Sequence, residues 1–95
     1  MRRAARRDDN EKAIVDALER VGCMVQKLTQ GDGVPDLLVG VPSGKLIVIE
    51  VKDGDKVPSA KRLSEKELAW HQRWARYPVF VVEDVEQAVK ASRWT

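Results

Sequence analysis

Two apolar, β-branched runs that lie close together in the chain constrain its fold most strongly. They span residues 34–41 and 45–51, and only a Pro-Ser-Gly connection at 42–44 separates them. A three-residue connection that ends in glycine is common in β-hairpins, because that position often takes a left-handed backbone that glycine adopts at no steric cost. The sequence therefore predicts a tight antiparallel hairpin in which Val41 pairs with Lys45.

The segments around this hairpin predict helices and further strands. Apolar residues recur at helical spacing over residues 9–22, where Asp9 or Asn10 can cap the start and Gly22 suits the end. Ser64 and Glu67 have the spacing of a capping box at the start of another helix. The other predictions are a strand over 23–28, an exposed loop over 53–63, a helix from 64 to about 76, a fully buried strand over 79–82 and a short helix over 85–91. The order α-β-β-β-α-β-α indicates an α/β fold with a mixed β-sheet and flanking helices.

The size and composition of the chain exclude several classes of protein. Ninety-five residues leave room for one domain, and 43% hydrophobic with 34% charged residues is ordinary globular usage. We expect a basic N-terminal arm over residues 1–8 and a single domain over 9–95. The longest apolar stretches, such as residues 79–82, are far too short to cross a bilayer, so we expect a cytoplasmic, intracellular protein. With one Cys and one His, the chain cannot form a disulfide or a four-ligand zinc site, so a metal ion would need oxygen ligands.

Two acids, Asp36 and Glu50, lie within the apolar runs of the hairpin, and Lys52 follows Glu50 by two residues. Because side chains alternate along a strand, Glu50 and Lys52 point to the same face. Counting back from the pair Val41 and Lys45 places Asp36 directly opposite Glu50, with the two Cβ atoms about 4.5 to 5.5 Å apart. Two converging carboxylates repel each other and favour a divalent cation such as Mg²⁺ or Mn²⁺. The alternative is an ordinary ion pair of Lys52 with one of these acids on a strand face exposed to water.

A third carboxylate lies on the apolar face of the first predicted helix. At 100° per residue, Glu11 falls within the arc of Ile14, Leu18 and Gly22, which should face the sheet. A simpler explanation is that Glu11 stays hydrated in the first turn, where acidic side chains favour the helix dipole. Three acids and a lysine at one site are nevertheless the composition expected for metal-assisted hydrolysis of a phosphodiester.

Cationic and aromatic side chains gather in parts of the sequence outside the hairpin. The cations form two groups, Arg2, Arg3, Arg6 and Arg7 at the start of the chain and Lys56, Lys61, Arg62 and Lys66 in its middle. Both groups could bind phosphates, although a solvated arm and a solvated loop explain them equally simply. Trp70, Trp74 and Tyr77 share one helix face and could stack on bases, but such a stripe is more often core or dimer interface. His71 could shuttle protons, while a surface histidine is the commoner case.

Two short motifs resemble the signature of the PD-(D/E)XK nuclease superfamily. Gly33-Val34-Pro35-Asp36-Leu37 resembles its first element, and Ile49-Glu50-Val51-Lys52 resembles its second. The Gly-x-Pro-Asp form, together with Leu63-Ser64 and the later Trp70-His71, is most similar to the VRR-NUC group of small nucleases found in phages, bacteria and eukaryotes. The resemblance covers about residues 11–89.

The resemblance implies a restriction-endonuclease-like α-β-β-β-α-β core and roles for particular residues. Glu11 would be the acid of the first helix, Asp36 and Glu50 the main metal ligands, the Val51 carbonyl a further ligand and Lys52 the catalytic lysine. Relatives often carry Gln near position 67, where this chain has Glu67. Since the capping box already explains Glu67, it is given little weight as a catalytic residue.

These observations together predict a Mg²⁺-dependent DNA endonuclease, with Mn²⁺ able to substitute. The resemblance further implies a homodimer related to Holliday junction resolvases, with selectivity for branched DNA. In this interpretation the DNA backbone is bound by Lys56, Lys61, Arg62 and Lys66, and the contact is extended by Arg6 and Arg7. Two other classes remain open, a non-catalytic nucleic-acid-binding module and an interaction subunit of a phage or repair complex.

Overall fold

The computed structural model describes residues 10–95, which form four strands and four helices. In chain order they are α1 (Glu11–Arg20), β1 (Met24–Lys27), β2 (Leu37–Gly40), β3 (Leu46–Val51), α2 (Pro58–Lys61), α3 (Glu65–Arg73), β4 (Val79–Val82) and α4 (Val85–Ala91). The predicted order is confirmed, with the short helix α2 added inside the segment expected to be a loop. Pro58 explains this addition, because proline is preorganised for the first turn of a helix.

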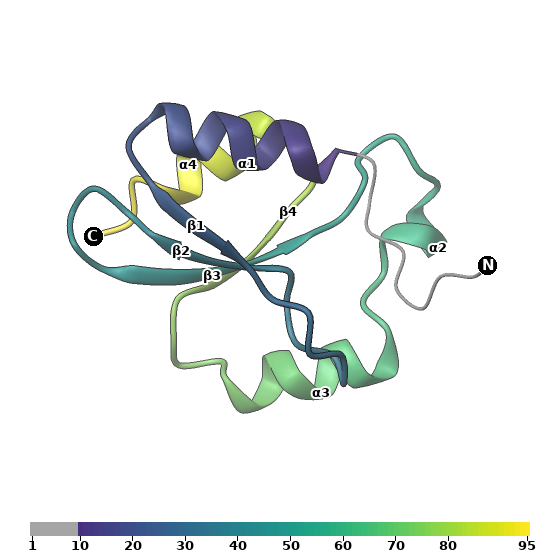
Figure 1. Cartoon of the computed structure of the whole chain (residues 1–95). Coiled ribbons are helices and arrows are strands. Elements are labelled where there is room, and N and C mark those ends of the chain that lie inside the picture. Colours follow the sequence, from purple (N-terminus) through teal and green to yellow (C-terminus); the bar gives the residue numbers. More distant parts are fainter. Residues whose placement is uncertain (1–9) are drawn as a thin grey trace.

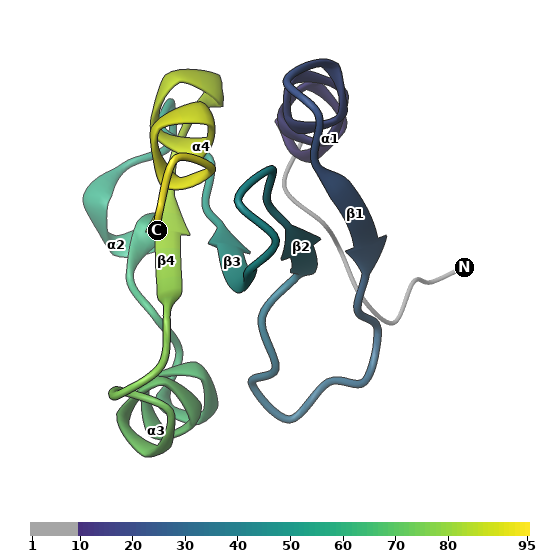
Figure 2. The ribbon, with the colours of Figure 1, turned by 90° about the vertical axis from the view of Figure 1, so that its left-hand side faces the viewer.

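The four strands form one mixed sheet with helices on both faces. Their order is β1-β2-β3-β4, with antiparallel pairing in the first three strands and parallel pairing between β3 and β4. Helices α1 and α4 lie side by side on one face of the sheet, and α3 lies on the opposite face (Figures 1 and 2). The predicted α/β fold with a mixed sheet and flanking helices is therefore confirmed.

The hairpin has the predicted register. The Val41 N–H donates to the Lys45 carbonyl at 2.9 Å, and Gly40 pairs with Leu46. Gly44 has φ +92°, the left-handed conformation that made glycine the expected residue at this position.

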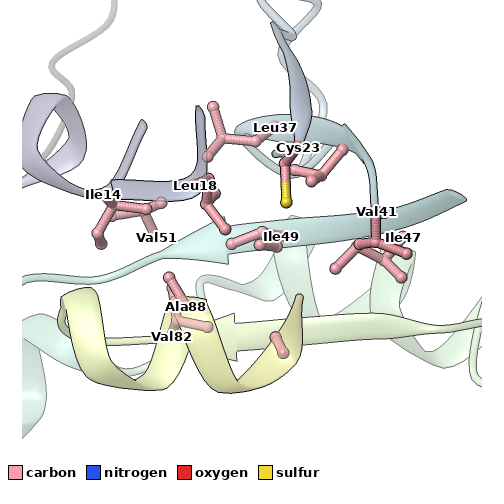
Figure 3. Packing of buried hydrophobic residues seen from close by; sticks show 12 residues of the cluster. Ile14, Leu18, Cys23, Leu37, Val41, Ile47, Ile49, Val51, Val82 and Ala88 are labelled. Carbon is pink, nitrogen blue, oxygen red and sulfur yellow. The ribbon is translucent and has the colours of Figure 1, made fainter. Parts of the chain in front are cut away.

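The hydrophobic core lies between the sheet and the pair of helices α1 and α4. Alternate residues of β3 point into it, and Ile14 and Leu18 of α1 cover them (Figure 3). Its strand members are Leu37, Val39, Ile47, Ile49, Val51 and Val82. Each large apolar side chain buried here contributes about 1.5 to 3 kcal/mol. Because β3 alternates, Glu50 and Lys52 emerge on the other face of the sheet, toward α3.

Several predicted boundaries and burial patterns differ from the structure. Strand β2 begins at Leu37 rather than at residue 34, because Pro35 has no N–H to donate to the ladder. The strand predicted at 79–82 is present, but the prediction that it is fully buried is wrong. Strand β4 is an edge strand, and Val81, which points away from the core, is 44% exposed. Within the described range, no residue of α3 is buried, so its aromatic stripe is not part of the core.

The start of the chain bears on two further predictions. Asn10 precedes α1, but its side chain makes no capping hydrogen bond. The predicted basic arm at residues 1–8, including Arg6 and Arg7, lies outside the described residues, as does Asp9. None of the helices in the described part of the chain is long and apolar enough to span a membrane.

Candidate active site

Asp36 is held at the point where the pairing of β2 with β3 ends. Extending the register beyond Leu37, which pairs with Ile49, places Asp36 opposite Glu50, as predicted. The Asp36 Oδ2 atom accepts a 2.7 Å hydrogen bond from the Val51 N–H. The Pro-Asp pair thus has a local role, because Pro35 interrupts the ladder and Asp36 takes up an N–H of β3.

Glu50 is a buried carboxyl group beside Asp36. Its residue is only 2% exposed, and its Oε1 atom is buried without a hydrogen-bond partner in the described part of the chain. Burial raises the pKa of Glu50 to about 9, and the negative charges of Asp36 and Glu67 act in the same direction. Lys52 lowers this pKa, but its effect is the smaller one. At neutral pH, with no additional cation, Glu50 is therefore protonated.

Lys52 reaches across the site to α3. Its Nζ atom lies 2.9 Å from Glu67 Oε1 and 3.9 Å from Glu50 Oε2, and its side chain is only 12% exposed. The alternative of an ion pair open to water is therefore wrong, since the lysine and both partner acids are largely buried. Lys52, Glu50 and Asp36 converge on one face of the sheet, as the spacing of the residues predicted.

Glu67 has two functions, of which the sequence revealed only one. Its side chain accepts a 2.8 Å hydrogen bond from the Ser64 N–H, and the Ser64 hydroxyl accepts one from the Glu67 N–H, which completes the predicted capping box. The same Oε1 atom binds Lys52. Burial alone would raise the pKa of Glu67, but the Ser64 N–H and the Lys52 ammonium outweigh it and hold that pKa below its ordinary value. The sequence did not reveal this contact with Lys52, and the low weight of Glu67 as a catalytic residue stays a prediction.

His71 lies against the acidic pair instead of on the surface. Its side chain is 14% exposed, and Nε2 lies 3.7 Å from Glu50 Oε1. Nε2 is also a buried atom without a hydrogen-bond partner among residues 10–95. Burial lowers the pKa of His71, so the imidazole is neutral near pH 7. Two sequence signals could have identified His71, its spacing of four from Glu67 on one helix and the Trp70-His71 pair of the resemblance.

Glu11 is buried at the start of α1, with 3% exposure, on the same helix face as Ile14 and Leu18. The explanation that it stays hydrated in the first turn is therefore wrong. The neighbouring Asn10 fixes this helix end, because its Nδ2 atom donates to the Lys52 carbonyl at 3.1 Å and to the Glu83 carbonyl at 2.8 Å. These two hydrogen bonds hold the start of α1 against the residues that directly follow β3 and β4, Lys52 and Glu83.

The acidic residues do not form a complete set of metal ligands in the described part of the chain. Among residues 10–95, no three His, Cys, Asp or Glu side chains are grouped so that they could hold a metal ion. Glu11 therefore does not form a common metal site with Asp36 and Glu50 in this structure, and its role as a ligand stays a prediction. The same applies to the Val51 carbonyl, although the residue itself is fixed between Asp36 and β4.

Gly33 allows the loop before Asp36 to approach α3. Its φ is +83°, and a Cβ atom there would lie 2.3 Å from the Lys66 carbonyl oxygen and 2.8 Å from the Glu67 nitrogen. No side chain can be accommodated at such distances without a backbone shift. The glycine of the Gly-x-Pro-Asp motif therefore sets the distance between the loop that carries Asp36 and the helix that carries Glu67.

The cations predicted to bind DNA differ in their availability. Lys61 is engaged with Glu83 at 3.3 Å and with the Gly54 carbonyl. Lys66 lies 3.7 Å from Asp32, but both side chains are highly exposed, so this pair is weak. Lys56 and Arg62 are exposed. Three of the four cations can thus be reached by a ligand, and their contact with DNA stays a prediction.

Comparison with known proteins agrees with this geometry. No family model matches the chain. A solved structure titled "VRR_NUC domain" has a TM-score of 0.65 and 33% sequence identity, covering 84% of this chain and 86% of that one. A protein of Acyrthosiphon pisum secondary endosymbiont phage 1, "Putative nuclease p44", is 35% identical over 65 residues, which are 66% of this chain and 70% of the phage protein.

Proposed function

The chain belongs to the VRR-NUC family of nucleases, and on this basis we propose that it is a Mg²⁺-dependent endonuclease that hydrolyses phosphodiester bonds in branched DNA such as Holliday junctions. One observation carries the proposal more than any other. Asp36 and Glu50 meet at the ends of paired strands with the ammonium group of Lys52 beside them, in a largely buried site. A carboxylate pair with an adjacent cation is suited to holding a divalent ion and to stabilising negative charge on phosphate.

The donor set suits Mg²⁺, which usually takes one or two carboxylates and completes its shell with water and phosphate oxygens. The buried Oε1 atom of Glu50, without a hydrogen-bond partner among residues 10–95, is an oxygen that a cation would satisfy. A cation would also favour the ionised form of Glu50, which burial and neighbouring charge disfavour. Asp36 and Glu50 would hold the ion, with Glu11 and the Val51 carbonyl as further candidates. The bound ion would polarise the scissile phosphate and lower the pKa of a water molecule.

Lys52 is the residue proposed to stabilise the charge that develops on the phosphate. Its Nζ atom is held at 2.9 Å by Glu67, which is itself fixed by the Ser64 N–H. A donor that is already oriented does not have to be reorganised during the reaction, which is the main advantage of such sites. We expect the Lys52→Ala variant to lose turnover more than metal affinity.

DNA is the proposed substrate because the family consists of nucleases and because several cations follow the site residues in the chain. Lys56 and Arg62 follow β3 in the chain, and Lys66 lies on α3 one residue before Glu67. Such cations bind phosphates without reading sequence, so the selectivity proposed here concerns DNA structure.

A homodimer is proposed because one such site cuts one strand, whereas a four-way junction needs two coordinated cuts. Exposed apolar side chains away from the active site support it. Met24 and Leu46 both pair with Gly40, so they flank a residue without a side chain on one face of the sheet. They are 78% and 63% exposed, at the opposite end of β3 from Lys52.

A cleavage assay with linear, flapped and four-way DNA in Mg²⁺ tests the proposal. The Asp36→Asn and Glu50→Gln variants should lose at least about 100-fold in rate and keep their affinity for DNA. Asp16→Asn is the matched control, because Asp16 is a half-exposed acid of α1 that pairs only with Lys12 among the described residues. Wild-type cleavage by either site variant would refute the assignment. Binding of all three DNAs with no cleavage in Mg²⁺ or Mn²⁺ would instead identify a non-catalytic module.

A further inference from the structure

Three aromatic side chains lie in a row along α3 and the turn that follows it. The rings of Trp70 and Trp74 lie almost parallel, with centroids 5.1 Å apart and an angle of 12° between their planes. Tyr77 continues this row, with its ring centroid 5.5 Å from that of Trp74 and its plane tilted by 55°. We refer to Trp70, Trp74 and Tyr77 as the aromatic stack.

The aromatic stack is not part of the hydrophobic core. Trp74 is 40% exposed and Tyr77 53%, and α3 contributes no buried residue within the described chain. Of the helices in residues 10–95, α1 and α4 pack together on one face of the sheet, and α3 lies on the other (Figure 2). Large aromatic rings left exposed in this way are typical of a binding surface.

The aromatic stack is continuous with the active site. The Trp70 ring meets the His71 ring edge to face at 5.7 Å, and His71 in turn faces Glu50 at 3.7 Å. At 100° per residue, Glu67 and His71 lie on one flank of the stripe formed by Trp70 and Trp74.

Cations lie on the other flank of the stripe. Lys66 and Arg73 occupy this side of α3, and Arg76 follows the helix. The two arginines are exposed and form no ion pair with any residue of the described range, and the contact of Lys66 with Asp32 is weak. A polyanion could therefore lie along α3 with its phosphates near these cations and its bases over the rings.

We propose that the aromatic stack binds unpaired bases of a DNA strand next to the phosphate that is cut. This inference rests on the proposed nuclease function and gives it a physical basis for structure selectivity. Aromatic rings can stack on a base only when its face is free, as it is in a flap, a gap or the open centre of a branched junction. In an uninterrupted duplex the neighbouring bases already cover these faces, so the aromatic stack should add nothing to its binding.

The test compares the affinities of single-stranded and fully paired DNA, measured by fluorescence anisotropy in EDTA, where no cleavage occurs. The Trp74→Ala variant should bind a single-stranded oligonucleotide about ten-fold more weakly and bind duplex DNA as the wild type does, since one base stacked on an aromatic ring contributes about this much. Trp74→Phe should restore most of the loss. Trp94→Ala is the matched control, because Trp94 is similarly exposed at 38% and also has a nearby cation, Lys45, at 5.8 Å from its ring.

Each outcome separates this inference from the proposed function. Equal losses for both DNA forms, or no loss for either, would overturn it. A change from dimer to monomer in Trp74→Ala, seen by sedimentation, would also overturn it and would identify the aromatic stack as a subunit interface. If the wild type binds single strands through Trp74 but cuts no DNA in Mg²⁺, the proposed function fails while this inference stands. If the wild type cuts DNA and Trp74→Ala cuts flapped and linear substrates with unchanged rates, only this inference fails.

Discussion

Replacing Glu50 with Gln should stabilise the folded protein at alkaline pH when no divalent ion is present. Burial, with the charges of Asp36 and Glu67, raises the pKa of Glu50 from an ordinary 4.5 to about 9. Between these two values the folded chain holds a proton that the unfolded chain has lost. The stability contributed by this proton is complete below pH 4.5 and is lost as the pH rises toward 9.

The size of the effect follows from the number of protons involved. One bound proton changes the free energy of unfolding by about 1.4 kcal/mol per pH unit. From pH 7 to pH 8.5, the wild type should therefore lose about 2 kcal/mol, a large part of the roughly 5 to 15 kcal/mol that stabilises an ordinary domain. His71 contributes little in this interval, because its pKa is lowered from 6.5 by burial and the imidazole is already mostly neutral in both states. The Glu50→Gln variant has no such proton, so its stability should stay nearly constant.

Urea denaturation in EDTA at pH 7.0, 7.75 and 8.5, followed by circular dichroism, measures these differences. Glu19→Gln serves as the control, because Glu19 is an exposed acid of α1 and its removal should leave the wild-type slope unchanged. Parallel pH dependence of the wild type and Glu50→Gln would refute the assignment of a buried, protonated Glu50. A wild type that becomes more stable as the pH rises would refute it more strongly.

Three further predictions concern the same site. Binding of Mg²⁺ at pH 7 should release about one proton from Glu50, seen as a calorimetric heat that depends on the ionisation enthalpy of the buffer, and Glu50→Gln should abolish this dependence. Gly33→Ala should lower the free energy of unfolding, measured in urea, by at least about 3 kcal/mol, because the added Cβ would lie 2.3 Å from a backbone oxygen. The control Gly31→Ala, at φ +76° with open space around it, should lower it by about 1 to 2 kcal/mol. Equal losses in the two variants would exclude the close approach at Gly33. Glu67→Gln should keep the capping box but slow cleavage about ten-fold through Lys52, and an unchanged rate would mean that the ion pair has no positioning role.

The central hairpin shows why part of the site could be predicted from local patterns. The turn at 42–44 fixes the register, and alternation along a strand then decides which side chains share a face. Asp36, Glu50 and Lys52 converge for this reason, and Asp36 bonds to the backbone of Val51 as well. The burial of β4 was predicted wrongly because an apolar run is the same for a central and an edge strand, and only the strand order distinguishes the two.

The sequence by itself determined the hairpin, its register and the face that carries Asp36, Glu50 and Lys52, since these depend on a turn of three residues and on the twofold period of a strand. The tertiary structure alone decided which groups surround them. Glu67 reaches Lys52 across 15 positions of the chain, and Asn10 reaches the Lys52 carbonyl across 42. Such contacts depend on how α3 and α1 pack on the two faces of the sheet, which no local pattern encodes. The raised pKa of Glu50 has the same origin, because the removal of water from a carboxyl group requires the assembled fold.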